Sequence, residues 1–335
     1  MKNILLLGGT RFVGRNIVEK LLEIGKYDIT LFNRGTSHPD LFPDIETIKG
    51  DRKNGEDLRR ISAREWDVVI DVSSYWAGAL EQQLALQYGK IGRYIYISTA
   101  SHYQFDKENP HLIKETEALV PCTAAQKVSE DIAFYNQNKA ECERILQNQK
   151  DLDLIMLRPG LIIGKYDYTD RLYYWFHKLK HQTDILIGNN GENLLSYTHV
   201  SDLADLVTRS IEVKNQFNVY NIPSFITSLK DLITIASEKL DIGVNLISAT
   251  PEFLERHGIR QWTDLPLWLA SDFLTLDNSR VLSDFDFSFS TVSETVDQLL
   301  AYYGKIKQWE SPKTEPAPIP PEKERELIAK IKNQV

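Results

Sequence analysis

The sequence contains few cysteines, no long apolar run and no excess of basic residues. Its two cysteines, Cys122 and Cys142, are too few for a disulfide scaffold or a zinc cluster, so we expect no metal site. No segment approaches the roughly 18 uninterrupted apolar residues of a membrane helix. The N-terminal apolar run reaches Arg11 too soon for a signal peptide. We therefore expect a cytoplasmic protein that does not bind membranes.

The charge balance argues against a nucleic-acid partner. The 335 residues include 39 Lys and Arg and 47 Asp and Glu, which gives a formal net charge of −8. Nucleic-acid binding needs clustered basic residues, whereas those of this chain are dispersed. The expected partner is therefore a small-molecule substrate. A second copy of the chain, forming a homodimer, is the other partner that we consider.

Short apolar segments alternate with helical patterns in the first half of the chain. The segments are rich in β-branched residues, and several are apolar throughout, which is typical of strands covered on both faces. The alternation predicts right-handed βαβ units and therefore an α/β fold with a Rossmann-type, doubly wound parallel sheet of about seven strands. Strands are predicted at 3–7, 28–32, 46–48, 67–71, 94–98, 154–158 and 217–222, and helices at 15–24, 132–146, 203–211 and 229–240.

The chain is predicted to divide into three parts. Residues 1–160 form a dinucleotide-binding Rossmann core, and residues 161–310 form a smaller substrate lobe with segments that return to the sheet. Residues 311–335 form a proline-rich tail and a short charged helix. Five of the thirteen prolines lie between positions 312 and 321, and proline favours an extended chain. We expect the tail to be a linker or a surface strap.

A glycine-rich turn follows the first predicted strand and precedes the first predicted helix. In this setting Gly8 permits the tight turn, and Gly14 permits close packing of helix on strand. The helix N-terminus offers free amide groups and the positive end of its dipole to phosphates. A purely structural turn is the alternative. The turn predicts a dinucleotide site that includes Gly8, Thr10, Arg11, Phe12, Val13 and Gly14.

The residues after the second predicted strand bear on the choice between NAD and NADP. A carboxylate there would bind the ribose 2′-hydroxyl of NAD, but this sequence has Asn33-Arg34. Arg34, with Arg11 nearby, favours NADP over NAD, unless Arg34 is a solvated residue that stacks on the adenine of either cofactor. After the third strand, in Asp51-Arg52, Asp51 is expected to bind the adenine amino group or to cap the following helix.

Three further residues form a candidate catalytic set. Thr99 ends the fifth predicted strand, and Tyr135 and Lys139 lie four residues apart in a predicted helix, which places them on one face. A lysine ammonium near a phenol lowers the phenol pKa, so that the phenol exchanges protons near neutral pH. Thr99 would then hydrogen-bond the same substrate oxygen. Because this spacing also occurs by chance, a structural role is the alternative.

The chain resembles the extended short-chain dehydrogenase/reductase family, the NAD(P)-dependent epimerases and dehydratases. The resemblance covers residues 1 to about 305 and rests on ordered motifs at 8–14, 51, 99, 135–139, 158–164, 199–204, 217–219 and 277–280. It implies that Tyr135 is the catalytic acid/base, that Lys139 binds the nicotinamide ribose and tunes Tyr135, and that Thr99 orients the substrate. It also implies cofactor contacts at Val72, Ser73 and Pro159.

Departures from the family pattern bear on the substrate. Arg11 replaces the middle glycine of the first turn, as it does in an atypical branch that includes chloroplast stem-loop RNA-binding proteins. Leu195 stands where nucleotide-sugar epimerases place an arginine against the substrate diphosphate, and the asparagine expected within 158–164 is missing. We therefore expect a small substrate other than a UDP-sugar. Epimerase, reductase and dehydratase chemistry stay open, and the alternatives are an RNA-binding or RNA-processing protein and a non-catalytic NADP(H) sensor.

Two segments have more than one interpretation. Residues 101–130 form a long connection before the catalytic helix, and they are either a lid over the site or a surface excursion. Trp262, Pro266 and Trp268 either wall a substrate pocket or belong to the core of the second lobe.

Overall fold

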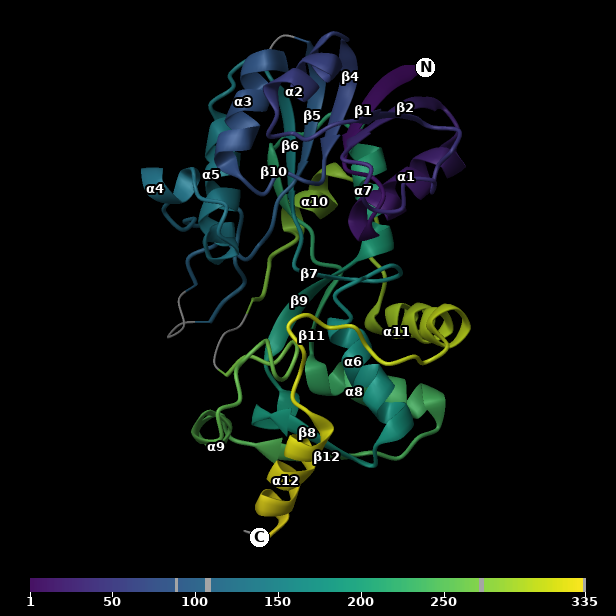
Figure 1. Ribbon diagram of the computed structural model, residues 1–335, viewed down its shortest axis with the longest axis vertical. Helices are drawn as coiled ribbons and strands as arrows, with labels where there is room; N and C mark the ends of the chain where they lie inside the picture. Colours follow the sequence, from purple (N-terminus) through teal and green to yellow (C-terminus); the bar gives the residue numbers. More distant parts are fainter. Residues whose placement is uncertain (88–89, 106–109, 271–273, 334–335) are drawn as a thin grey trace.

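The computed structural model describes residues 1–87, 90–105, 110–270 and 274–333 (Figure 1). Its central sheet has seven strands in the order β10-β6-β5-β4-β1-β2-β3, and all neighbouring strands are parallel. The strands are β1 (Lys2–Leu7), β2 (Tyr27–Asn33), β3 (Glu46–Lys49), β4 (Trp66–Asp71), β5 (Ile91–Ile97), β6 (Asp153–Arg158) and β10 (Val219–Asn221). The predicted doubly wound parallel sheet is confirmed. Strand order reverses between β1 and β4, where such sheets bind ligands at the carboxyl ends of the strands.

Helices cover both faces of this sheet. Ile4 and Leu6 of β1 pack with α1, α7 and α10 on one face, and Leu5 packs with α2, α3 and α5 on the other. Successive strand residues point to opposite faces, so β1 is apolar on both sides. The helices are α1 (Phe12–Ile24), α2 (Gly55–Ser62), α3 (Ala77–Gln87), α5 (Tyr135–Gln147), α7 (Val200–Ser210) and α10 (Ser279–Asp284). Among the described residues, no helix is long and apolar enough to cross a membrane.

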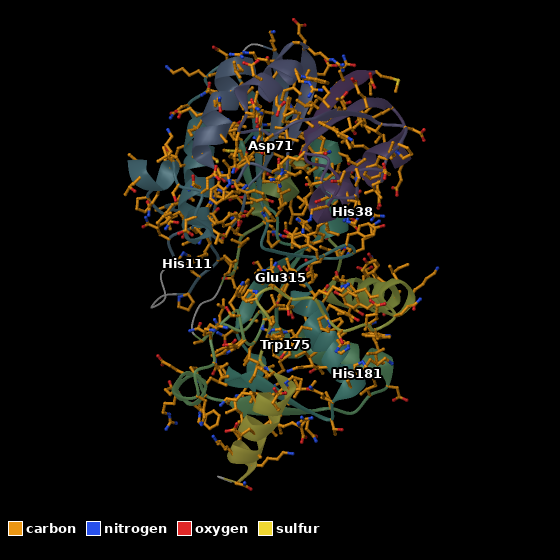
Figure 2. The ribbon with its side chains drawn as sticks, in the orientation of Figure 1. His38, Asp71, His111, Trp175, His181 and Glu315 are labelled. Atoms are coloured by element: carbon orange, nitrogen blue, oxygen red, sulfur yellow. The ribbon has the colours of Figure 1, made fainter. Side chains whose placement is uncertain are left out.

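A second unit lies beyond the carboxyl ends of the strands (Figure 1). Trp175 is fully buried in its core (Figure 2), which is built largely from aromatic and branched side chains. Its strands are β7 (Leu161–Ile163), β8 (Asp184–Gly188), β9 (Leu194–His199), β11 (Phe225–Ser228) and β12 (Asn245–Ala249). Its helices and turns are α6 (Arg171–His181), η2 (Asn189–Gly191), α8 (Leu229–Leu240), α9 (Pro251–Arg256), α11 (Val292–Tyr302) and η3 (Tyr303–Lys307). β10 and α10 come from this half of the chain but return to the central sheet.

The C-terminal tail packs on the second unit of its own chain. The Lys313 amide donates to Asp170, and the Ile319 amide donates to the carbonyl of Asp264. The tail ends in α12 (Pro321–Lys332), whose Glu324 forms a buried ion pair of 2.6 Å with Lys178. The tail is therefore a strap fixed at several points along the second unit.

The described residues of the connection at 101–130, which are 101–105 and 110–130, are held to the rest of the chain by hydrogen bonds. The Val120 amide donates to His102, the Ile113 amide donates to Thr275, and Arg144 donates to the carbonyl of Val120. Two short helices, α4 (Ala124–Lys127) and η1 (Ile132–Phe134), lead into α5. None of its described residues lines the pocket presented below. This placement fits the surface excursion rather than the lid.

Candidate functional site

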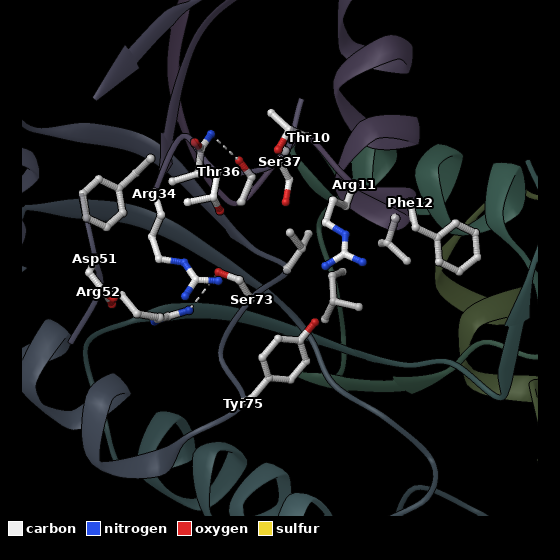
Figure 3. A pocket seen from close by; sticks show the side chains of 18 of the residues that line it. Thr10, Arg11, Phe12, Arg34, Thr36, Ser37, Asp51, Arg52, Ser73 and Tyr75 are labelled. Atoms are coloured by element: carbon white, nitrogen blue, oxygen red, sulfur yellow. Dashed lines mark hydrogen bonds between the residues drawn. The ribbon is translucent and has the colours of Figure 1, made fainter. Parts of the chain in front are cut away.

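A pocket of about 380 Å³ opens at the carboxyl ends of β1, β2, β3 and β4 (Figure 3). It brings together most of the residues predicted for cofactor binding and catalysis, although they come from distant parts of the chain. The predicted residues that line it are Gly8, Thr10, Arg11, Phe12, Val13, Gly14, Asn33, Arg34, Asp51, Arg52, Val72, Ser73, Tyr135 and Lys139. Thr99 and Pro159 do not line it, although Ser98 and Ile162 near them do.

The glycine turn forms one wall of the pocket. Gly8 has φ of +114°, and a Cβ there would lie 2.7 Å from Val72 Cγ2. A Cβ on Gly14 would lie 2.7 Å from the Gly9 nitrogen, so the packing of α1 on the turn excludes any side chain. No described side chain caps the N-terminus of α1 at Arg11, which leaves its first amides available to an anion. The turn fits the diphosphate of a dinucleotide.

The side chains of Asn33 and Arg34 differ in whether they are free to bind a ligand. The Asn33 side chain donates to the carbonyl of Gly8 at 3.1 Å and accepts from the Gly35 amide at 2.8 Å. It therefore fixes the turns after β1 and β2 to each other. Arg34 is exposed at the rim and makes no hydrogen bond or ion pair with the described residues. Arg34 and Arg11 lie on opposite sides of the pocket (Figure 3), so the two arginines are not adjacent as the sequence suggested.

The Arg52 side chain is held by hydrogen bonds to other residues of the protein. Its two Nη atoms bind the two oxygens of Asp71 at 3.0 Å each, and one of them also donates to Ser73 Oγ at 3.1 Å. Asp71 is fully buried and also accepts from the hydroxyl of Tyr94. The Arg52 charge holds the pKa of Asp71 well below its usual range, despite burial, which acts in the opposite direction. Arg52 thus joins the segments that follow β3 and β4 and forms part of the pocket lining.

Asp51 lines the pocket but does not cap the next helix. Its carboxylate accepts from the Lys53 amide at 3.0 Å within its own turn. The cap of α2 is Asn54, whose side chain accepts from the Glu56 amide at 2.9 Å. The capping alternative for Asp51 is therefore wrong, whereas its place in the pocket lining agrees with the other alternative.

Tyr135 begins α5 and lines the inner end of the pocket. Burial raises its pKa above the ordinary value, and a hydrogen bond from Thr99 opposes this effect only in part. The sequence predicted that Lys139 would lower this pKa. In the structure burial prevails, because a phenolate loses more solvation than the surrounding groups return. Tyr135 is accordingly a neutral phenol at neutral pH.

Lys139 lies one turn further along α5 and is buried beneath the pocket. Its Nζ donates to the carbonyl of Ile97 at 2.6 Å and to that of Ser74 at 3.1 Å. It also lies 4.2 Å from the ring centre of Tyr96. Burial lowers the pKa of Lys139 to about 8. The ammonium therefore fixes the ends of β4 and β5 around the inner part of the pocket.

Sequence reasoning missed several aromatic residues that line the pocket. Tyr75 and Trp76 follow β4, and the ring centres of Tyr75 and Tyr135 are 6.0 Å apart. Tyr168 reaches the pocket from the second unit. The place of Tyr75 and Trp76 just after a strand end was a usable signal, because parallel strands bring their carboxyl ends together. The sequence contained no such signal for Tyr168, because the place of this residue in the pocket depends on the path of the chain after β7.

The tryptophan segment of the second unit contributes mainly to its core. Trp268 is 4% exposed, and Pro266 accepts a hydrogen bond from the Trp175 indole. These positions support the core interpretation. Trp262 is half-buried, and the guanidinium of Arg171 lies 5.3 Å from its ring centre.

The model of the NAD dependent epimerase/dehydratase family matches residues 4–222. The chain belongs to this family. Its fold also resembles those of solved epimerase and dehydratase structures. At 16–17% sequence identity this similarity establishes only the fold. The dTDP-glucose 4,6-dehydratase of Bacillus anthracis matches with a TM-score of 0.72 and 17% identity, over 92% of this chain and 98% of that one. The UDP-glucuronic acid 4-epimerase of Bacillus cereus matches with a TM-score of 0.70 and 16% identity, over 92% of this chain and all of that one.

Curated proteins that are similar in sequence include the following two. The chloroplast stem-loop binding protein of 41 kDa b of Arabidopsis thaliana is 32% identical over an alignment of 218 positions, which covers 61% of this chain and 53% of that protein. A UDP-glucose 4-epimerase of Neisseria meningitidis is 28% identical over an alignment of 189 positions, which covers 50% of this chain and 55% of the enzyme. The chain spans about half the length of each of these relatives. One of them is named as a binding protein and the other as an epimerase.

Proposed function

We propose that this protein is an NAD(P)-dependent oxidoreductase of the epimerase/dehydratase type. Residues 1–160 would hold the dinucleotide and 161–310 the substrate, with the tail at 311–335 as a structural strap. One observation carries the proposal: Tyr135, Lys139 and the glycine turn line the same pocket. A glycine turn with a purely structural role would not explain why a buried lysine and a tyrosine line the same pocket.

The proposed chemistry divides between cofactor and protein. A bound nicotinamide would supply or accept a hydride. Tyr135, neutral because burial raises its pKa, would donate a proton to the substrate oxygen in the reducing direction. The phenolate left by that step would take the proton back in the oxidising direction. Lys139 would hold the pocket floor and place a positive charge beneath it, and Thr99 would hydrogen-bond near the phenol. Whether the nicotinamide is regenerated in place separates an epimerase or dehydratase from a reductase.

The test of the proposed function is Tyr135→Phe. We expect the rate on any carbonyl or sugar substrate that the wild type turns over to fall by about 10²–10⁴, the usual contribution of a general acid/base. Dinucleotide affinity, measured by fluorescence titration, should change little because the ring remains. Tyr27→Phe, far from the pocket, is the matched control. Full turnover in Tyr135→Phe would contradict the assignment.

We further propose that the cofactor is NADP(H) in preference to NAD(H). Support comes from Arg34, which is exposed at the pocket rim and unpaired among the described residues. No carboxylate follows β2 in Asn33-Arg34-Gly35 to bind a ribose 2′-hydroxyl. Arg52 does not support this preference, because its guanidinium is bound to Asp71.

RNA binding is the second candidate, because one relative is a stem-loop binding protein. The formal charge of −8 opposes it, since RNA affinity depends on clustered cations. Gel-shift titration with a stem-loop RNA, with and without NADPH, distinguishes the two. Salt-sensitive binding at submicromolar concentration that survives Tyr135→Phe would favour the RNA function over the enzyme.

A further inference from the structure

One face of α1 contacts the segment at 165–168 through three successive pairs. Arg11 lies with its guanidinium carbon 3.8 Å from the ring centre of Tyr168, and Arg15 lies 3.5 Å from that of Tyr166. Glu19 forms an ion pair of 2.9 Å with Lys165. Arg15 and Glu19 are four residues apart and therefore share one face of α1. Arg11, the residue just before α1, continues this side of the helix through its contact with Tyr168. We call these three pairs the α1 ladder.

The two inner pairs of the α1 ladder are firmly held. Glu19 also binds Arg15 at 2.8 Å, so the second and third pairs share a carboxylate. Tyr166 packs edge-on against Tyr302 of α11, with ring centres 5.8 Å apart. Its φ of +69° lies in the left-handed region, which a tyrosine adopts only when its surroundings impose it. The inner pairs therefore anchor the segment that carries Tyr168.

The outer pair, Arg11 and Tyr168, lies at the pocket. Both residues line it, and Tyr168 remains 54% exposed. The Arg11 side chain reaches into the pocket (Figure 3). Packing does not require an exposed tyrosine here. Tyr168 lines the pocket together with Tyr75 and Tyr135.

Arg11 differs from Arg15 in its charge partners. Arg15 is neutralised by Glu19, whereas no ion pair of Arg11 is found among the described residues. Arg11 immediately precedes α1, beside the free amides of its first turn. A diphosphate at this helix end carries about two negative charges, and an arginine beside it makes strong charge-assisted hydrogen bonds. The unpaired guanidinium is thus positioned for the dinucleotide diphosphate, with the Tyr168 ring against its face.

We propose that Arg11 and Tyr168 form a clasp over the diphosphate of the bound dinucleotide, that the inner pairs of the α1 ladder hold this clasp closed, and that the clasp slows release of the cofactor. The inference rests on the proposed function, because it requires a dinucleotide in this pocket. It assigns to the second unit a role in retaining the cofactor. Slow release suits chemistry in which the nicotinamide is regenerated in place rather than exchanged at each turnover.

The experiment measures cofactor release from the full chain. Protein loaded with NADH or NADPH is mixed rapidly with excess oxidised dinucleotide, and the loss of energy transfer from tryptophan, with Trp76 in the pocket wall, gives the release rate. The variants are Tyr168→Leu, Tyr168→Phe, Arg11→Gln and the double variant Arg11→Gln/Tyr168→Leu. Lys20→Gln is the control, because it removes a positive charge from α1 at a residue paired with Asp205.

Loss of the stacked pair should raise the release rate by roughly fivefold to thirtyfold in Tyr168→Leu, the range that a cation–π contact supports. Arg11→Gln should release at least as fast, because it also loses the phosphate contact. The double variant should release no faster than Arg11→Gln, since the two residues act as one unit. Tyr168→Phe keeps the ring and should stay near the wild-type rate, as should Lys20→Gln.

Three results would overturn the clasp. Wild-type release rates in Tyr168→Leu and Arg11→Gln, with cofactor still bound in the pocket, would refute the clasp and leave the proposed function intact. Failure of the wild type to bind either dinucleotide would refute both. Thermal unfolding of each variant checks the fold, and both residues are exposed enough at the rim for the variants to remain folded. Equal acceleration in Tyr168→Phe would also refute the stacking role.

Discussion

Arg34 is the residue on which the cofactor preference depends. It is exposed at the pocket rim opposite Arg11 (Figure 3). A charge-assisted contact with the 2′-phosphate is worth about 1.5–3 kcal/mol. Arg34→Gln should therefore weaken NADPH binding by roughly tenfold or more and leave NADH binding almost unchanged, as calorimetry would measure. Arg60→Gln, an exposed arginine outside the pocket, is the control. Equal wild-type dissociation constants for NADPH and NADH would disprove the preference.

His102 makes stability sensitive to acid. It is fully buried, 3.5 Å from the Glu143 carboxylate that Arg158 also binds. Burial lowers its pKa to about 3, despite the favourable charge of Glu143. Since histidine in the unfolded chain titrates near 6.5, the unfolded state binds an additional proton between these values. This contribution is therefore absent above pH 6.5 and favours unfolding increasingly as the pH falls from about 6.5 toward 3.

His102→Gln removes this titration. We expect the free energy of unfolding, measured with urea from pH 7 to pH 4, to fall less steeply with pH than in the wild type. The variant loses stability at neutral pH if Gln packs less well, so the slope rather than the absolute value is compared. His38→Gln, at an exposed histidine, should keep the wild-type slope. An unchanged slope in His102→Gln would show that carboxylates alone govern acid unfolding.

At the scale of elements, the strap and α12 stabilise the second unit. Glu324 accepts from Lys178 at 2.6 Å and from the Leu186 amide at 3.0 Å, and both partners of the ion pair are almost completely buried. Removing one partner of such a pair leaves a buried charge and costs about 3–5 kcal/mol. Glu324→Ala should lower the unfolding free energy by this amount in calorimetry. Exposed Glu322→Ala is its control, and similar stability of the two variants would contradict a structural role for α12.

Elements were predictable where burial gave them an apolar pattern. The strands at 3–7, 67–71 and 154–158 correspond to β1, β4 and β6, which are covered on both faces. The predicted helix at 229–240 corresponds to α8 residue for residue. The short strands of the second unit, such as β7 and β11, were not predicted. Their three or four residues carry too little periodicity, and only pairing with β9 defines them.

At the scale of the whole molecule, the two units meet around the pocket, and their charges bear on the substrate. Lys165 is bound to Glu19, whereas Arg171 forms a hydrogen bond with Thr169 but no ion pair among the described residues. Leu195 is 1% exposed and contributes no charge. Burying a diphosphate without adequate cations costs several kcal/mol. We therefore predict no micromolar binding of UDP-glucose or UDP-galactose.

Calorimetry with NADPH present checks this prediction. A micromolar dissociation constant for either sugar would contradict it. If that binding were lost in Arg171→Gln and kept in Lys165→Gln, Arg171 would be identified as the cation that receives the diphosphate. The two variants distinguish between the two cations, because Lys165 is already neutralised by Glu19.

The sequence by itself determined the parallel sheet, the glycine turn and most of the polar residues that meet in the pocket. These follow from local periodicity and from the rule that parallel strands gather their carboxyl ends at one edge. Tertiary structure alone decided what each side chain does there. Arg52 is taken up by Asp71, Asn33 joins two turns, burial raises the pKa of Tyr135, and Tyr168 reaches the pocket from the second unit. Such roles depend on the distances between residues that are far apart in the chain. These distances determine solvation and charge pairing, and local sequence does not encode them.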